Sequence, residues 1–166
     1  MKKQLFFLFT LITSTLFGQQ DNETFSQLKS LEGKWVGTIE YSNQDPKPMN
    51  LSYSIKSNGS ALVEESNEGG IEMTTIFNVQ KDKMLSTHYC GLQNRPVAEL
   101  VSNQNGIVSL KTNQKLSNLD QKEDTFVGSW KFNLSPKTPD SFTYAYTVIG
   151  PEGEVFTAKA ELSRVK

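Results

Sequence analysis

The chain has 166 residues, with 17 Lys or Arg, 18 Asp or Glu and a formal net charge of −1. This length suits one domain with a sizeable core. The near-neutral balance, without a run of basic residues, excludes an electrostatic footprint for nucleic acid or an anionic membrane surface. A single cysteine excludes an internal disulfide, so packing alone must stabilise the core.

The first 18 residues have the layout of a secretory signal peptide. Lys2 and Lys3 precede an uncharged apolar run from Leu5 to Phe17. That run is shorter than the roughly 20 apolar residues that span a bilayer. We expect residues 1–18 to be removed on export to the periplasm or beyond. Residues 19–166 then form one domain without an integral membrane segment. The alternative is that this stretch remains as an anchor or a buried helix.

The periodicity of the remaining chain changes after residue 32. Residues 22–32 place Phe25, Leu28 and Leu31 at steps of three, which predicts a short helix. Alternation with a period of two, typical of strands, then runs to residue 112 and resumes from residue 125 to near the end. The strand-like stretches are GKWVGTIEY, LSYSIKS, SALVEES, IEMTTIFNV, MLSTHYC, RPVAELVS, IVSLKT, TFVGSWKFNL, SFTYAYTVI and EVFTAKAEL. Residues 113–124 lack the alternation and predict a loop or a short helix.

About ten short strands joined by hairpin-length turns predict an antiparallel meander. Asn58-Gly59 is the clearest turn signal, since both residues tolerate positive φ. Closure into a barrel would remove the two exposed edges of such a sheet. A two-sheet sandwich is the rival, but only residues 113–124 could supply its longer connection. We expect an all-β, up-and-down antiparallel barrel of about ten strands, after a short N-terminal helix.

The sequence resembles the lipocalins and their calycin relatives near both ends of the domain. Gly33-Lys34-Trp35 matches the lipocalin G-x-W, and Arg164 is placed like the basic residue that packs over that tryptophan from the last strand. The resemblance implies a lipocalin-like barrel closed by Gly33, Trp35, Gly37 and Arg164. The stretches LEGKWVG, GSALVE and THYCGLQNRP further resemble a group of exported bacterial lipocalin-like proteins of no established function.

His88 and Cys90 are the only histidine and the only cysteine, two positions apart on one predicted strand. Side chains at i and i+2 share a face about 7 Å apart, which allows a shared metal ion but is long for a thiol–imidazole hydrogen bond. A zinc site needs three or four ligands, so carboxylates such as Glu64 or Glu99 would have to complete it. A cysteine nucleophile needs its base in contact. We expect no metal site and no enzyme.

Heme is a further alternative, because Gly33, Trp35 and Gly37 also match the G-x-W-x-G of nitrobindin-like barrels. Those barrels take their proximal histidine from the C-terminal part of the chain. Residues 125–166 contain no histidine here, so we expect no heme. A Soret band on hemin titration that disappears in His88→Ala would reverse this expectation.

Two interpretations of the barrel interior remain. In one, His88 bonds a carbonyl or carboxylate and pins the Asn94-Arg95-Pro96 turn, and the barrel is a packed structural or interaction domain. In the other, the barrel holds a small apolar molecule. The candidate ligand-binding residues are His88, Tyr89, Cys90, Glu64 and Asn94. We expect small-molecule binding, although a fold by itself does not fix a function.

Overall fold

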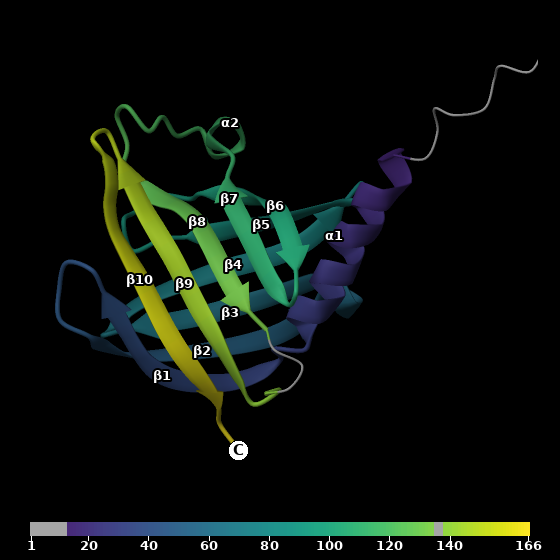
Figure 1. Ribbon diagram of the computed structural model, residues 1–166, viewed down its shortest axis with the longest axis horizontal. Coiled ribbons are helices and arrows are strands. Elements are labelled where there is room, and N and C mark those ends of the chain that lie inside the picture. The colour runs from purple at the N-terminus through teal and green to yellow at the C-terminus, as the bar shows by residue number, and fades with distance from the viewer. Residues whose placement is uncertain (1–12, 135–137) are drawn as a thin grey trace, which may run out of the picture.

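The computed structural model of the protein describes residues 13–134 and 138–166. Its strands form one closed barrel in which each strand pairs with its chain neighbours and β1 pairs with β10 (Figure 1). The strands are β1 (Gly33–Tyr41), β2 (Lys47–Lys56), β3 (Ala61–Glu68), β4 (Ile71–Gln80), β5 (Lys83–Tyr89), β6 (Val97–Gln104), β7 (Ile107–Thr112), β8 (Phe126–Asn133), β9 (Ser141–Gly150) and β10 (Gly153–Arg164). The predicted all-β, up-and-down barrel of ten strands is confirmed, and the sandwich alternative is wrong.

In the described residues, three helical segments accompany the barrel: α1 (Thr13–Lys29), η1 (Ser57–Gly59) and α2 (Gln114–Ser117). Helix α1 starts earlier than the predicted helix and ends three residues before it. Helix α2 lies in the 113–124 segment, where a loop or short helix was expected. Residues 1–12 of the expected signal peptide lie outside the described residues. None of the described helices combines the length and apolar character needed to cross a bilayer.

Side chains alternate between the interior and the outer surface along each strand. On β5, Met84, Ser86 and His88 are buried, whereas Lys83 and Tyr89 at its ends are exposed. Tight turns hold this register. Gly69 and Gly70, between β3 and β4, have φ of 61° and 99°. Positive φ at both central residues gives a hairpin turn whose twist matches that of the strands.

Helix α1 closes one end of the barrel, on the right of Figure 1, opposite the β1–β2 loop on the left. Phe25, Leu28 and Leu31 are buried in the same core cluster as Trp35. The Trp35 indole Nε1 donates a hydrogen bond to the Leu31 carbonyl at 2.7 Å. The apolar face predicted from steps of three therefore packs into the barrel, and the tryptophan ties the chain after α1 to β1.

Arg164 covers Trp35 at the seam where the barrel closes. The two residues are direct partners in the β1–β10 pairing. The guanidinium Cζ lies 4.2 Å from the centroid of the indole ring, and Nη1 and Nη2 donate to the carbonyls of Glu32 at 2.6 Å and Ser30 at 3.0 Å. This is the stacking and carbonyl contact expected of a planar guanidinium.

Gly37 allows the same two strands to approach closely. A Cβ built at this position would collide with the backbone oxygen of Glu161 on β10. Gly33 has a φ of +124°, a conformation that side chains rarely adopt. Steric constraints at the seam therefore favour glycine at both positions of the G-x-W-x-G stretch.

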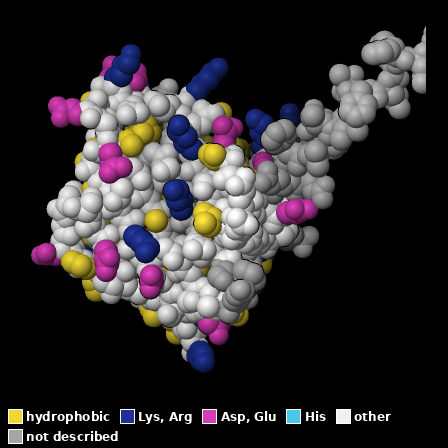
Figure 2. All heavy atoms as spheres, in the orientation of Figure 1, with side chains coloured by type: hydrophobic (Ala, Val, Ile, Leu, Met, Phe, Trp, Pro, Cys, Tyr) yellow, Lys and Arg dark blue, Asp and Glu magenta, His cyan; other side chains and the backbone are white. Residues whose placement is uncertain are grey.

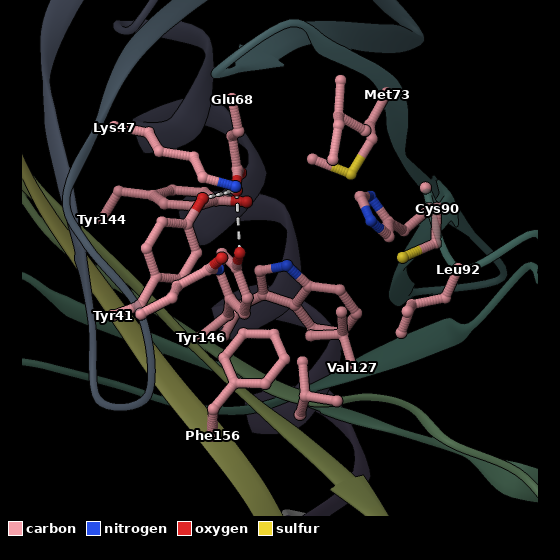
Figure 3. A pocket seen from close by; sticks show the side chains of 16 residues that line it. Tyr41, Lys47, Glu68, Met73, Cys90, Leu92, Val127, Tyr144, Tyr146 and Phe156 are labelled. Carbon is pink, nitrogen blue, oxygen red and sulfur yellow. Dashed lines mark hydrogen bonds between the residues drawn. The ribbon is translucent and has the colours of Figure 1, made fainter.

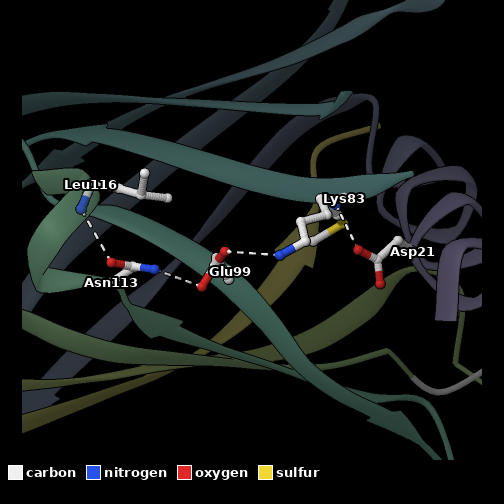
Figure 4. A network of polar contacts seen from close by, with 6 residues as sticks. Asp21, Lys83, Glu99, Asn113 and Leu116 are labelled. Atoms are coloured by element: carbon white, nitrogen blue, oxygen red, sulfur yellow. Dashed lines mark hydrogen bonds and ion pairs between the residues drawn. The ribbon is translucent and has the colours of Figure 1, made fainter. Parts of the chain in front are cut away.

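A polar network outside the barrel attaches α1 and α2 to neighbouring strands (Figure 4). Asp21 Oδ2 accepts a hydrogen bond from the Met84 backbone at 2.7 Å. Glu99 accepts from the Asn113 side chain at 2.8 Å and lies 3.9 Å from the Lys83 ammonium. Glu99, one of the carboxylates considered for a zinc site, is therefore engaged outside the barrel.

The outer surface carries charges of both signs. Figure 2 shows Lys and Arg side chains interspersed with Asp and Glu over the visible face, without a large area of one sign. This arrangement agrees with the near-neutral composition.

We predict that Arg164→Ala lowers the free energy of unfolding by about 2 kcal/mol, because it removes the cover of Trp35 and two hydrogen bonds. Lys159→Ala on the same strand is the control, since this lysine is 60% exposed and makes only a 3.9 Å ion pair. We expect it to change stability by less than about 0.5 kcal/mol. Urea denaturation of both variants measures the difference, and equal losses would contradict the role given to Arg164.

Candidate functional site

A cavity of about 140 Å³ opens at the end of the barrel opposite α1. Aromatic rings form much of its wall, and polar groups reach it from several strands (Figure 3). Its lining residues are Tyr41, Gln44, Lys47, Glu68, Ile71, Met73, His88, Cys90, Gly91, Leu92, Val127, Trp130, Tyr144, Tyr146, Val148 and Phe156. In another protein, an engineered apolar cavity of about 150 Å³ binds benzene. The cavity thus has room for about one aromatic ring, and a larger ligand would extend through its mouth.

Glu68, at the end of β3, presents a carboxylate to this cavity. It is 4% exposed, and its Oε2 accepts hydrogen bonds from the hydroxyls of Tyr41 at 3.0 Å and Tyr146 at 2.8 Å. Burial raises the pKa of Glu68, while the two hydroxyls and the charge of Lys47 lower it. Figure 3 shows these side chains converging on Glu68 from one side of the cavity.

A second set of polar residues lies inside the barrel, where four side chains on neighbouring strands form a row of direct cross-strand partners. Tyr53 on β2 pairs with Glu64 on β3, Glu64 with Thr75 on β4, and Thr75 with His88 on β5. The Tyr53 hydroxyl donates to Glu64 Oε2 at 2.5 Å, and the Thr75 hydroxyl donates to Glu64 Oε1 at 3.0 Å. Thr75 Oγ1 also lies 2.9 Å from His88 Nδ1. The row joins the middle of the barrel to the cavity.

The row determines which nitrogen of His88 carries a proton. The Thr75 hydroxyl has one hydrogen, so while it donates to an ionised Glu64 it can only accept from His88. Nδ1 must then carry the proton, and Nε2 is left as a lone-pair acceptor. His88 is 3% exposed, and burial lowers its pKa to about 4, so the ring is neutral at physiological pH.

His88 and Cys90 both line the cavity, as their shared face predicted. No hydrogen bond joins the two side chains in the described residues, and burial raises the pKa of the Cys90 thiol. A protonated thiol is a weak nucleophile. In the ranges 13–134 and 138–166, no three His, Cys, Asp or Glu side chains are grouped so that they could hold a metal ion.

The five candidate ligand-binding residues lie in different parts of the structure, and only some of them line the cavity. His88 and Cys90 line the cavity, whereas Glu64 does not and is linked to it through Thr75 and His88. Tyr89 is a correction, because it is 50% exposed on the outer face of β5 and cannot contact a ligand inside.

Asn94 is a second correction. It is not among the described lining residues, and its side-chain amide donates to the Thr125 carbonyl at 2.8 Å. Its backbone carbonyl accepts a hydrogen bond from the Cys90 backbone N–H at 3.0 Å. The left-handed residue of this turn is Gln93, with φ of 62°, rather than Asn94. Asn94 therefore holds the β5–β6 loop in place.

Sequence reasoning did not identify Glu68 or Thr75 as site residues. Glu68 follows Leu62, Glu64 and Ser66 at steps of two, so the alternation of β3 already places it on the inner face. Thr75 stands between Met73 and Phe77 in the same way on β4. Polar residues at inward positions were the available signal.

No protein-family model and no curated protein matches the chain. Solved structures that share the fold include a DUF3598-family protein of unknown function from Nostoc punctiforme PCC 73102, with a TM-score of 0.57 and 13% identity over 83% of this chain. The matched region is 49% of that protein, so the chain spans about half its length. The S-type phycobiliprotein lyase CPES from Guillardia theta has a TM-score of 0.53 and 13% identity, over 93% of this chain and 98% of its own. These likenesses show a lipocalin-like barrel fold.

We predict that Glu64→Gln gains stability relative to the wild type as the pH rises. Burial raises the pKa of Glu64 from 4.5 to about 7 in the folded protein. The folded carboxyl therefore keeps a proton that the unfolded chain releases, and its contribution to stability is lost as the pH rises from 4.5 through 7. A neutral amide avoids this loss. We expect a relative gain of roughly 3 kcal/mol between pH 4.5 and pH 8. Denaturation across this range measures it, and exposed Glu65→Gln should show no such trend.

We also predict the protonation state of His88. Its pKa of about 4 means that the ring stays neutral at pH 5.5. At pH 8 the Nδ1–H form should dominate, because Glu64 is then ionised and fixes the direction of the Thr75 hydroxyl. Because the chain has one histidine, the ring ¹⁵N chemical shifts need no assignment. Thr75→Val should abolish the Nδ1–H preference, and outward-facing Thr74→Val should preserve it. An Nε2–H ring in the wild type at pH 8 would contradict this prediction.

Proposed function

We propose that this protein is an exported barrel that binds a small, largely apolar molecule in the cavity at its open end. The observation that carries the proposal is the open cavity itself, with His88 pointing into it from β5. A ligand site of this kind combines apolar and aromatic walls with a few placed polar groups. The apolar wall here includes Trp130, Val127 and Phe156, and the polar atoms come from Glu68 and His88.

The distribution of packing along the barrel axis supports the proposal. At the α1 end, the Trp35 and Phe142 rings pack edge to face with centroids 4.8 Å apart, and apolar side chains of α1 join the same buried core. At the other end, Val127 and Val148 stand among the lining residues of the cavity. The mixed aromatic, aliphatic and polar lining of this end supports binding over a packed interaction domain.

Export is supported by the N-terminal sequence and is compatible with the contacts of α1. The described contacts that attach α1 to the barrel include those of Asp21, Phe25 and Leu28, all after residue 18. Removal of residues 1–18 would leave these contacts in place. Mass spectrometry of the protein from its host should find an N-terminus near Gln19, and an intact Met1 on the mature protein would overturn this part of the proposal.

We predict that benzyl alcohol, a neutral ligand with one ring, binds in the cavity. The chain has two tryptophans, which makes the measurement internally controlled. Trp130 lines the cavity, and Trp35 is buried under Arg164 at the other end. In ¹H–¹⁵N NMR titrations, the indole N–H signal of Trp130 should shift with saturation and that of Trp35 should not.

Cavity filling provides the matched comparison. Val127→Phe should weaken benzyl alcohol binding at least tenfold, because the added ring occupies the cavity. Val101→Phe makes the same change at a side chain that is 63% exposed and should bind as the wild type does. Equal binding by both variants, or no saturable shift at Trp130, would overturn the proposal.

A further inference from the structure

The polar atoms that Glu68 and its partners present to the cavity are hydrogen-bond acceptors. Tyr41 and Tyr146 each have one hydroxyl hydrogen, and both hydrogens are directed to Glu68 Oε2. The two hydroxyls are also in hydrogen-bond contact with each other, so they have no hydrogen left to donate to a ligand. Glu68 Oε1 has no hydrogen-bond partner among the described residues, and it is not one of their fully buried unpaired atoms. This oxygen is therefore free to meet a ligand.

His88 adds an acceptor from another wall of the cavity. Its Nδ1–H is committed to Thr75 while Glu64 is ionised, as shown above. The ring nitrogen that remains for a ligand, Nε2, then carries a lone pair and no proton. A ligand that complements these atoms would donate hydrogen bonds to the Glu68 carboxylate and to the His88 imidazole.

Aromatic rings surround the carboxylate. Tyr41, Phe156 and Tyr146 contact each other in sequence, with ring centroids 6.0 Å and 6.2 Å apart and planes inclined by 63° and 71°. Tyr144 continues the series at 6.1 Å from Tyr146. All four rings line the cavity. Ring faces attract cations, and this attraction strengthens where water is excluded.

The protein already places one cation of its own at this site. Lys47, which is half-buried at the start of β2, has its ammonium 5.7 Å from the centroid of the Tyr41 ring. Figure 3 shows its side chain reaching toward Glu68, and its charge lowers the pKa of that carboxyl. A lysine on a flexible stem can move away from the mouth, so Lys47 occupies the position of a displaceable internal ligand.

We propose that the cavity selects small organic ammonium ions, which donate to Glu68 Oε1 and place their apolar part against Trp130 and Val127. This inference rests on the proposed function and specifies its ligand class. The size of the cavity limits the buried part to about one ring. An anionic ligand is disfavoured, because it would face the Glu68 carboxylate and the lone pairs around it.

Three ligands of matched size test this selectivity: benzylammonium, benzyl alcohol and benzoate, titrated at pH 8 and low ionic strength with Trp130 as the NMR reporter. We expect benzylammonium to bind at least tenfold more tightly than benzyl alcohol, and benzoate more weakly than either. Glu68→Gln should reduce benzylammonium affinity at least tenfold and reduce benzyl alcohol affinity less, because the alcohol carries no charge. Exposed Glu65→Gln on the same strand is the control and should change neither.

Lys47→Met gives an independent test at a position near the mouth, where a change need not disturb the fold. Removal of the internal cation should raise benzylammonium affinity at least threefold and raise it more than the affinity for benzyl alcohol. If benzyl alcohol binds and benzylammonium binds no more tightly, the ammonium inference is wrong and the proposed function stands. If none of the three ligands shifts Trp130, both are wrong.

Discussion

Closure of the sheet between β1 and β10 is the constraint on which the rest of the molecule depends. Once every strand has two partners, each inward side chain has only the lumen in which to find its contacts. Apolar residues satisfy this condition by packing. The inward polar residues, Glu64, Thr75 and His88 among them, must satisfy one another, because unpaired buried polar groups are costly. The seam itself is held by Gly37, which lets the backbones approach, and by Arg164 over Trp35.

The two ends of the lumen differ in their lining. At one end, apolar side chains of α1 and the Trp35 indole belong to one buried core. At the other, a buried carboxyl with its tyrosines lies beside an open cavity, although burial of a carboxylate opposes folding. Proteins commonly keep such a group where it has a partner to recognise. The contrast between the ends is the main physical argument for binding.

Much of the fold could be predicted from the sequence. The alternation of period two, the turn at Asn58-Gly59 and the G-x-W stretch were sufficient for the barrel and for its strand count. The register also lay within reach. A hairpin turn pairs residues that stand at equal distances on either side of it. The turns centred on residues 58–59, 69–70 and 81–82 therefore pair Tyr53 with Glu64, Glu64 with Thr75 and Thr75 with His88. Sequence reasoning recognised the first of these turns but did not carry the register across the strands, and so it missed Thr75.

Other features of the site could not be predicted in this way. Tyr41 and Tyr146 meet at Glu68 from strands β1 and β9, far apart in the sequence, and only closure of the ring brings them together. The volume left between the rings depends on side-chain conformations that alternation does not specify. Asn94 was misjudged for a simpler reason, since a turn amide that looks available in sequence is engaged with the distant Thr125 carbonyl.

The cross-strand row from Tyr53 to His88 has a consequence for proton uptake. A molecule that donates to His88 Nε2 would favour the direction in which the Thr75 hydroxyl donates to Glu64, and an ionised Glu64 strengthens that direction. Such a ligand would therefore lower the proton affinity of a carboxyl that it never touches. With the pKa of Glu64 raised by burial to about 7, binding at neutral pH would release protons to solvent, and acidification would favour the empty barrel.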